Sequence, residues 1–494
     1  MARKWESYAL TYRAREVETL AGWIAAGESG SVVGLAGCGR TNLLEFLCHR
    51  PDVLRSYLPP PARPVVLIPV DLNNLPVNNP STLYRTLLRA FYQVLGEEAG
   101  EKTADVFKTS ADWKSLRQTV DALYLENRAA QDPFLAQSAL HDLLALLQEE
   151  QVQVVLALNR FDRFCQRATP QMINTMRGLR DTFKDTLCYL VGMRQEVAYL
   201  PEPADLGEMY DLLDSHVCWV GAMAESDAWR MLETITQAAP PPPPEAEARV
   251  MLALSGRFPS LLKAIAHWWL ANHQQPTALD DWLDILLAER SIQYRLERLW
   301  DGLTQEEQLA LTEVQKLHAQ AIGGKAGDGE EGKTIPRRLE RAFQSLAKRQ
   351  YYALTRLAAK GLCYQADQGW WISGGLVAAF VAAIEGRVQG KIWLDEQTKT
   401  IYQGQDPIEG ITTLQYEILR FLIKNPRAKH SQDAVIDNAW PEEDHREGIT
   451  PNALQVHIAS IRKKIEPNPA KPRYLITWHG RPGGYQFFPE GKPA

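Results

Sequence analysis

The chain has 494 residues, of which 45% are hydrophobic and 23% charged, and its formal net charge is −6. Single cores rarely grow beyond about 250–300 residues, so this length predicts several domains. No segment approaches the roughly 20 apolar residues of a membrane-spanning helix, and the first residues lack the apolar stretch of a signal peptide. We therefore expect a cytoplasmic protein with no membrane partner. The acidic balance excludes a protein that is basic all over, so affinity for nucleic acid has to come from local patches.

The first half of the chain alternates between helical and strand patterns. Residues 1–30 predict an amphipathic helix, and the apolar run 31–35 predicts a strand that leads through a glycine-rich turn into a helix at 42–48. Continuous apolar runs predict buried strands at 65–73, 153–159, 187–194 and 217–223, and helical patterns lie between them at 82–97 and 135–150. Strands that alternate with helices predict a doubly wound α/β layer.

The second half reads differently. Residues 226–272 predict helices, and the proline run 240–244 predicts a rigid polyproline loop. A block at 280–386 begins with a long helix that ends at 299–304, and it finishes with a helix and an alternating hairpin, the pattern of a winged helix. We expect four domains, at 1–223, 224–279, 280–388 and 389–494.

The glycine-rich turn carries the clearest motif of the first half. Its sequence GLAGCGRT, from Gly34 to Thr41, matches the phosphate-binding loop G-x-x-x-x-G-K-[ST] except that Arg40 stands in the place of lysine. Glycines let successive backbone N–H groups face an anion, and the helix N-terminus adds its positive end. A glycine turn without a ligand is the alternative.

The segment from about residue 12 to residue 386 resembles the STAND and Cdc6/ORC-like branch of AAA-type P-loop ATPases, in the phrase YRAREVETLAGWI, the loop that follows it and the order of the elements. The resemblance implies ATP or ADP as cofactor, with Mg²⁺ held by the Thr41 hydroxyl. A site that binds no nucleotide is the alternative. It also implies a set of nucleotide-binding positions, which are Gly34, Gly37, Gly39, Arg40, Thr41, Asn159, Asp162, Arg194 and Pro259.

Two of these positions, and Arg160 next to one of them, depart from the family pattern. Arginine is a planar fork that does not replace the compact lysine cation. The metal-holding aspartate of the family is Asn159 here, and its catalytic glutamate is Arg160, which cannot act as a general base. We therefore expect little or no ATP hydrolysis. Arg194 as a salt-bridged strand end and Pro259 as a simple helix start are the alternatives for those two positions.

The last hundred residues carry the pattern TPNALQVHIASIRKKIEP, 450–467, followed by YLITWHGRPGGYQF. A helix with basic last turns can enter the major groove of DNA, and the hairpin that follows it, with its glycine-rich tip, can lie beside the groove as a wing. The stretch 391–488 resembles the winged-helix output domain of OmpR/PhoB-type response regulators, which implies double-stranded DNA as partner. The expected DNA-facing residues are Asn452, Gln455, His457, Ser460, Arg462, Lys463, Lys464, His479 and Arg481. A winged helix that docks protein is the alternative.

The sequence as a whole predicts a multidomain α/β plus α+β protein: a P-loop nucleotide-binding domain, a helical lid, a winged helix and an OmpR-type winged helix. Its predicted function is that of a DNA-binding transcriptional regulator. The acidic loop 441–447 offers a contact for RNA polymerase, although a solvated loop is the simpler interpretation. A homo-oligomer, an active ATP-driven switch that assembles on DNA, and a non-enzymatic scaffold subunit of a defence or mobile-element complex remain alternatives. The cations between 333 and 349 predict a solvated face rather than a DNA contact.

Overall fold

The computed structural model of the chain forms two compact units, Met1–Ala378 and Ala379–Ala494. It describes all residues except 1–4, 61–62, 73–74, 97–112, 130–131, 201, 238–241, 273–277, 324–336, 367–368, 386–389, 397, 405, 440–450, 467–468, 470–471, 479–482 and 492–494. The acidic loop 441–447 and part of the proline run 240–244 lie outside the described residues. The finer division into four domains stays a prediction.

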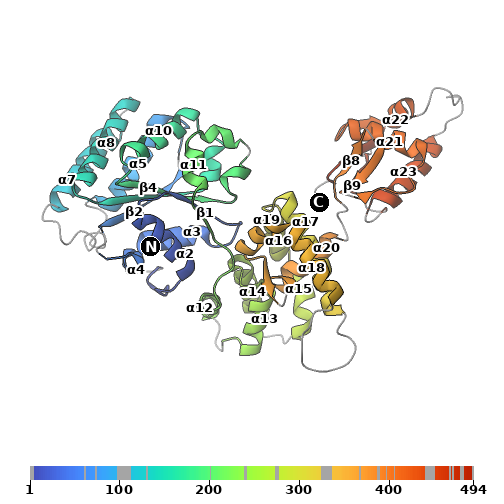
Figure 1. Ribbon diagram of the computed structural model, residues 1–494, viewed down its shortest axis with the longest axis horizontal. Helices are drawn as coiled ribbons and strands as arrows, with labels where there is room; N and C mark the ends of the chain where they lie inside the picture. The colour runs from blue at the N-terminus through green and yellow to red at the C-terminus, as the bar shows by residue number, and fades with distance from the viewer. Residues whose placement is uncertain are drawn as a thin grey trace. The chain divides into compact units, whose positions relative to one another are not determined.

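A five-stranded sheet forms the centre of the first unit, and it confirms the predicted α/β layer. Its strands, in the order β2-β3-β4-β1-β5, are Val65–Asp71, Gln153–Asn159, Leu187–Met193, Gly30–Val33 and Val217–Trp219. All neighbouring strands are parallel. Helices cover both faces (Figure 1), which is why these strands read as continuous apolar runs rather than alternating ones.

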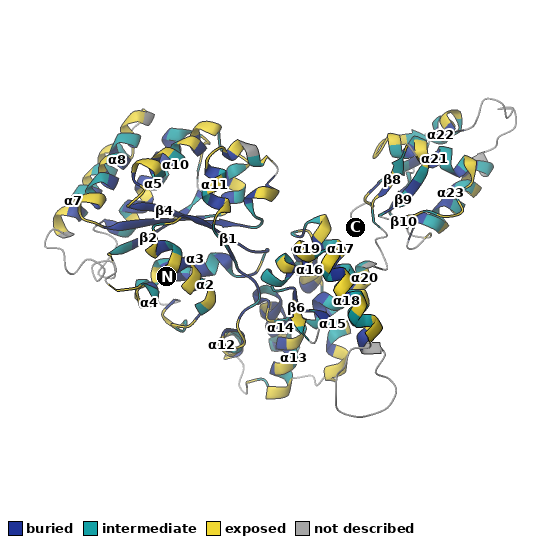
Figure 2. Ribbon diagram, viewed as in Figure 1, coloured by how far each residue is buried: buried dark blue, intermediate teal, exposed yellow. Residues whose placement is uncertain are grey.

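The helices of the α/β layer turn buried sides toward the sheet and exposed sides outward (Figure 2). One face is covered by α2 (Ala14–Ala25), α3 (Arg40–His49) and α4 (Pro51–Tyr57). The other face is covered by α5 (Pro80–Leu95), α7 (Trp113–Asn127), α8 (Pro133–Glu149), α10 (Pro170–Thr182) and α11 (Met209–Asp214). The buried side chains of β2, β3 and β4 and of α5, α8 and α10 form one continuous core.

Two predicted helices differ from the observed ones. Residues 1–30 do not form a single helix, because Arg13 adopts a left-handed conformation (φ 54°) and α2 begins only at Ala14. The expected long helix before residue 300 is divided into α15 (Trp282–Ala288) and α16 (Arg290–Trp300). Glu289 between them is extended (ψ 116°), and an extended residue cannot continue a helix.

The remainder of the first unit is helical apart from one hairpin. The predicted lid comprises α12 (Glu225–Thr236), α13 (Glu245–Ser255) and α14 (Pro259–Asn272). The following block contains α15, α16, α17 (Gln305–Gly323), α18 (Arg337–Arg349), α19 (Tyr351–Ala359) and the antiparallel pair β6 (Cys363–Ala366) and β7 (Gly369–Ile372). Helix α20 (Gly375–Glu385) follows this hairpin.

A buried ion cluster joins this block to the sheet. Lys360 donates to the carboxylate of Glu307 at 2.6 Å, and both side chains are 0% exposed. Arg356 lies 3.3 Å from Glu307 and 3.2 Å from Glu196, which follows β4. Burial lowers the pKa of Lys360, and the attraction of Glu307 opposes that shift. Ion pairs that are fully removed from water are costly to break on one side only.

The second unit packs three helices against two small sheets around one apolar core. An antiparallel sheet of β8 (Ile392–Asp395), β9 (Thr400–Gln403) and β10 (Asp406–Pro407) leads in. Helices α21 (Thr413–Lys424), α22 (Gln432–Ala439) and α23 (Pro451–Ile465) follow, with β11 (Lys429–Ser431) between the first two. The hairpin β12 (Leu475–Trp478) and β13 (Gly484–Phe487) completes a sheet with β11. This is the expected winged helix.

We predict that Lys360→Met lowers the free energy of unfolding of the first unit by about 3 kcal/mol, because it leaves a buried carboxylate with Arg356 alone. The double variant Lys360→Met/Glu307→Leu should regain most of this loss. Urea unfolding followed by tryptophan fluorescence measures both, and Lys348→Met, at an exposed position of α18, is the matched control. If Lys360→Met and the control Lys348→Met have equal free energies of unfolding, the buried Lys360–Glu307 pair does not have the role given to it here.

Candidate functional site

The phosphate-loop motif lies between β1 and α3, at the carboxyl end of a central strand. Gly34 donates its N–H to the Met193 carbonyl at the end of β4 (3.1 Å), which ties the start of the loop to the sheet. At the tip, the Ser260 N–H of the lid donates to the Gly37 carbonyl (3.1 Å). The loop is therefore held from below by the sheet and from above by α14.

The glycines of the loop are required by its geometry. Gly37 and Gly39 have φ of 85° and 92°, in the left-handed region that other residues rarely adopt. A Cβ on Gly37 would lie 2.3 Å from the Ser260 hydroxyl oxygen, and one on Gly34 would lie 2.6 Å from the Val220 carbonyl oxygen. The sequence motif thus corresponds to close backbone approaches as well as to a turn.

Arg40 is buried beneath the loop. Its side chain is 8% exposed, its Nη1 donates to the Gly34 carbonyl (3.3 Å), and its Nε has no hydrogen-bond partner among the described residues. Gly192 of β4 provides the room: a Cβ there would lie 3.4 Å from Arg40 Nε and 3.2 Å from Asn159 Oδ1. The strand behind Arg40 carries no side chain at this position.

The loop, the ends of β3 and β4 and the start of α14 enclose a cleft of about 380 Å³, here called the phosphate cleft. Its lining includes most of the predicted nucleotide-binding residues, namely Gly37, Gly39, Arg40, Thr41, Asp162, Arg194 and Pro259. Gly34 and Asn159 lie behind the lining, where they bond to Arg40 and Thr41 respectively. The structure brings these residues together, and their role in binding stays a prediction.

Cations dominate the phosphate cleft. The described lining residues carry five positive side chains, Arg40, Arg160, Arg163, Arg194 and Lys263, and a single carboxylate, Asp162. Burial lowers the pKa of Arg194, and the neighbouring Arg298, Arg163 and Arg160 lower it further, while Asp162 opposes them. Burial likewise lowers the pKa of Arg40. Such a cluster favours a polyanionic ligand.

Arg160 holds a strained backbone at the end of β3. Its φ of 59° places a non-glycine residue in the left-handed region, directly before helix α9 (Phe161–Cys165). Strain of this kind costs on the order of 1 kcal/mol and collects at functional positions. Here it directs the chain from Asn159, behind the loop, to Asp162, in the cleft.

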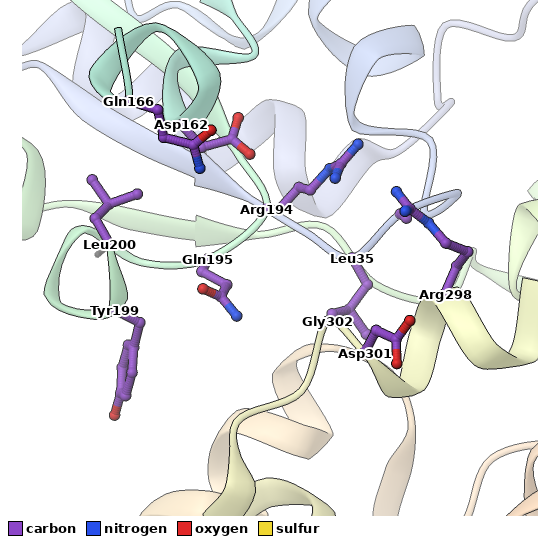
Figure 3. A pocket seen from close by; sticks show the side chains of 11 residues that line it. Leu35, Asp162, Gln166, Arg194, Gln195, Tyr199, Leu200, Arg298, Asp301 and Gly302 are labelled. Carbon is purple, nitrogen blue, oxygen red and sulfur yellow. The ribbon is translucent and has the colours of Figure 1, made fainter. Parts of the chain in front are cut away.

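A second cleft of about 320 Å³ adjoins the first through Leu35, Ala36, Asp162 and Arg194. Figure 3 shows Arg194, from the end of β4, between Asp162 of α9 and Arg298 of α16. Gln166, Gln195, Tyr199, Asp301 and Gly302 also line it. A helix of the following block therefore adds a further cation to the rim of the site.

The donor set does not fit the Mg²⁺ ion that the resemblance implied. The Thr41 hydroxyl and the Asn159 amide bond to each other, Thr41 Oγ1 to Asn159 Oδ1 at 3.3 Å and Asn159 Nδ2 to Thr41 Oγ1 at 3.2 Å. Magnesium prefers oxygen ligands that include carboxylates. Within the described part of the chain, no group of three or more His, Cys, Asp or Glu side chains is placed to hold a metal.

Sequence reasoning missed Arg13, which supports the loop. Its Nη2 donates to the Cys38 carbonyl (2.7 Å) and its Nη1 to the Gly221 carbonyl (3.0 Å), while its side chain is 1% exposed. The signal was present in the phrase YRAREVETL, where an arginine precedes an amphipathic helix. Lys263 and Arg163 were also missed, because their only signal is one turn's distance from a predicted site residue.

In the second unit, α23 is the predicted DNA-facing helix. Leu454, Ile458, Ile461 and Ile465 face the core. The opposite side is exposed at Gln455, Val456, Ala459 and Lys463, and Val456 is 67% exposed. Val456 and Ala459 were not predicted, although helical spacing places them between Gln455 and Lys463. We call these four residues the exposed face of α23.

Three predicted DNA-facing residues form hydrogen bonds within the domain. Arg462 donates to the Leu475 carbonyl and the Thr477 hydroxyl, both at 2.8 Å, and burial lowers its pKa. The Ser460 hydroxyl accepts from the Gln415 amide (3.0 Å). Lys464 donates to the Gly410 carbonyl and to Gln415 Oε1. His457 is half-buried.

The remaining predicted positions are beyond what the structure describes. His479 and Arg481 lie in the undescribed segment 479–482, and the side chain of Asn452 is not described either. Near the hairpin, Glu466 at the end of α23 accepts the backbone N–H groups of Arg473, Tyr474 and Leu475 at 2.6–2.9 Å. This carboxylate fixes the first strand of the hairpin to the helix.

Comparison with known families supports the second unit. Residues 407–487 match the family described as "Transcriptional regulatory protein, C terminal". The uncharacterized transcriptional regulatory protein YrkP of Bacillus subtilis is 29% identical over 100 residues, which are 20% of this chain and 41% of that protein. The transcriptional regulatory protein YvrH of the same organism is 32% identical over 78 residues, 15% of this chain and 31% of YvrH. The chain thus spans less than half the length of these curated relatives.

Solved structures with loose likeness cover about three quarters of the chain. The Walker-type ATPase PABY2304 of Pyrococcus abyssi is 14% identical, with a TM-score of 0.42, over 75% of this chain and 95% of that one. The ORC2 protein of Aeropyrum pernix, solved with ADPNP and ADP, is 14% identical with a TM-score of 0.34 over 75% and 92%. The α/β assignment rests on the sheet order and the loop after β1. No described helix is long and apolar enough to cross a membrane.

We predict that Arg462→Ala lowers the free energy of unfolding of the second unit by about 1.5–3 kcal/mol, because it removes charge-assisted hydrogen bonds to the hairpin. Lys463→Ala, the adjacent exposed cation, should change stability by no more than about 0.5 kcal/mol. Thermal unfolding of the two variants compares them directly. Equal stability would show that Arg462 is not anchored in the fold.

Proposed function

We propose that the protein is a DNA-binding transcriptional regulator whose first unit carries a nucleotide-binding module with little or no ATPase activity. The observation that carries the DNA-binding half is the match of residues 407–487 to the C-terminal domain of transcriptional regulatory proteins, together with the exposed face of α23 within that segment. We propose that the residues of α23 that the fold leaves exposed make the first contacts with DNA.

The exposed face offers the kinds of contact that the major groove accepts. Gln455 can pair with an adenine edge, and Val456 and Ala459 can pack against a thymine methyl group. Lys463 supplies a phosphate contact, which fixes register and gives salt dependence. In this proposal Arg462, Ser460 and Lys464 hold the helix in place, while Asn452, His457, His479 and Arg481 remain predicted contacts.

The nucleotide half of the proposal is supported by the phosphate cleft. Backbone N–H groups, the N-terminus of α3 and five cations favour the phosphates of ATP or ADP. Arg160 stands where the family pattern has its catalytic glutamate, and a guanidinium cannot act as a general base, so we expect little or no hydrolysis of bound ATP. Nucleotide would act as an effector, and Mg²⁺ does not belong to the proposed site.

The four predicted domains then have separate roles: nucleotide binding at 1–223, the lid at 224–279, a winged helix that packs on them at 280–388, and DNA binding at 389–494. The proposal places the protein in the cytoplasm. RNA polymerase, other protein subunits and a second copy of the chain are the candidate partners on DNA.

We predict that the full chain binds random duplex DNA in fluorescence anisotropy and that binding weakens steeply as salt rises. Lys463→Ala should weaken binding to all sequences and reduce the slope of log K against log salt by about 1. Lys348→Ala, which removes an exposed cation from α18, is the matched control and should leave binding unchanged.

The same titration separates the alternatives. No binding at low salt would favour a scaffold whose winged helices dock protein. A loss of binding in Lys348→Ala equal to that in Lys463→Ala would move the DNA contact to the middle block.

We predict no phosphate release from ATP above the rate of the Arg40→Ala variant. The reason is that the site lacks a carboxylate base and a carboxylate metal ligand in the positions of Arg160 and Asn159. Turnover that Arg40→Ala abolishes would overturn the inactive module and support the ATP-driven switch.

A further inference from the structure

We infer that the phosphate cleft binds a nucleoside polyphosphate without a metal ion, and that arginine and lysine side chains supply the positive charge that Mg²⁺ supplies in other phosphate loops. This inference rests on the proposed function in one respect, which is that the loop 34–41 receives phosphate.

The first support is the charge balance of the cleft. Five cations and one carboxylate line it, and none of the five forms an ion pair with another described residue. The adjoining cleft adds the cation of Arg298 and the carboxylate of Asp301, and so leaves this balance unchanged. Arginines pair bidentately with phosphate and stay charged under all ordinary conditions. A polyanion would replace repulsion between these side chains with ion pairs.

The second support is the state of the metal ligands. The Thr41 hydroxyl bonds to the neutral amide of Asn159, so no carboxylate accompanies it at the place where the family pattern puts the metal. The neutral amide of Asn159 neither attracts a divalent cation nor repels a phosphate. Arg160 follows it in a left-handed conformation and lines the cleft. The position that holds the metal in the family pattern is therefore neutral here, and the next position adds a positive charge to the cleft.

The third support is Arg40 itself. It is more than nine-tenths buried, it lines the cleft, and its Nε has no hydrogen-bond partner within the described chain. A buried guanidinium without a full set of partners is costly. Its positive charge, opposed in the described lining only by Asp162, would attract a phosphate and repel Mg²⁺.

The test is isothermal titration calorimetry of the full chain with ATP, in EDTA and in excess Mg²⁺. We expect ATP to bind in EDTA with a Kd equal to or below the value in Mg²⁺, because magnesium neutralises charge that the cleft attracts. Arg160→Asn removes a cation while keeping a residue that tolerates positive φ. It should weaken binding in EDTA by on the order of tenfold.

Two further variants sharpen the test. Asn159→Asp restores a carboxylate of equal shape and should make binding tighter in Mg²⁺ than in EDTA. Arg89→Ala removes an exposed cation of α5 and should leave both affinities unchanged.

Wild-type binding that requires Mg²⁺ would overturn the inference and leave the nucleotide module standing. The absence of ATP binding in both buffers would overturn the nucleotide half of the proposed function as well, while DNA binding is decided by anisotropy.

Discussion

The shape of the phosphate loop depends on one buried cation, Arg13. Its guanidinium binds the carbonyls of Cys38 in the loop and of Gly221 after β5, and its own backbone N–H donates to Asp227 of α12 at 2.9 Å. One residue thus connects the N-terminal segment, the loop, the edge of the sheet and the first lid helix. Its left-handed backbone, which ends the helical pattern before α2, is compensated by these contacts. The loop needs such support because its glycines confer no rigidity of their own.

The sequence predicted the parts of the fold that are set by local pattern. The runs 153–159 and 187–194 were recognised as buried strands because a parallel strand covered on both faces has no polar side. The nucleotide-binding positions converged because parallel strands end at the same edge, so Asp162 after β3 and Arg194 after β4 meet at the loop after β1. Helix α7 and the break at Glu289 were not predicted, since neither has a glycine or proline signal that marks its boundary.

The DNA-facing set was harder to predict, for a physical reason. Arginine and lysine have long side chains that reach either solvent or the nearest free carbonyl, and the sequence alone does not decide between them. Arg462 reaches the Leu475 carbonyl because Glu466, four residues later, brings the hairpin strand against the end of α23. Lys463 is the next residue of the helix, and its side chain is exposed to solvent instead. Which cation is available to DNA is therefore set by the hairpin and not by the basic run itself.

If the proposed effector site binds nucleotide without hydrolysis, the contacts of Arg194 suggest how the first unit is controlled. Arg194, which lines the phosphate cleft, is separated by one residue from Glu196, which pairs with Arg356 of α19 at 3.2 Å, and Arg356 adjoins the buried Glu307–Lys360 pair. An anion that attracts Arg194 thus acts on the end of β4, and the same segment pairs through Glu196 with Arg356 of α19. A ligand shifts such an equilibrium only by its differential affinity for the two states. Without hydrolysis no chemical step resets that shift, so the state of the block would follow the concentration of the nucleotide and its rate of release.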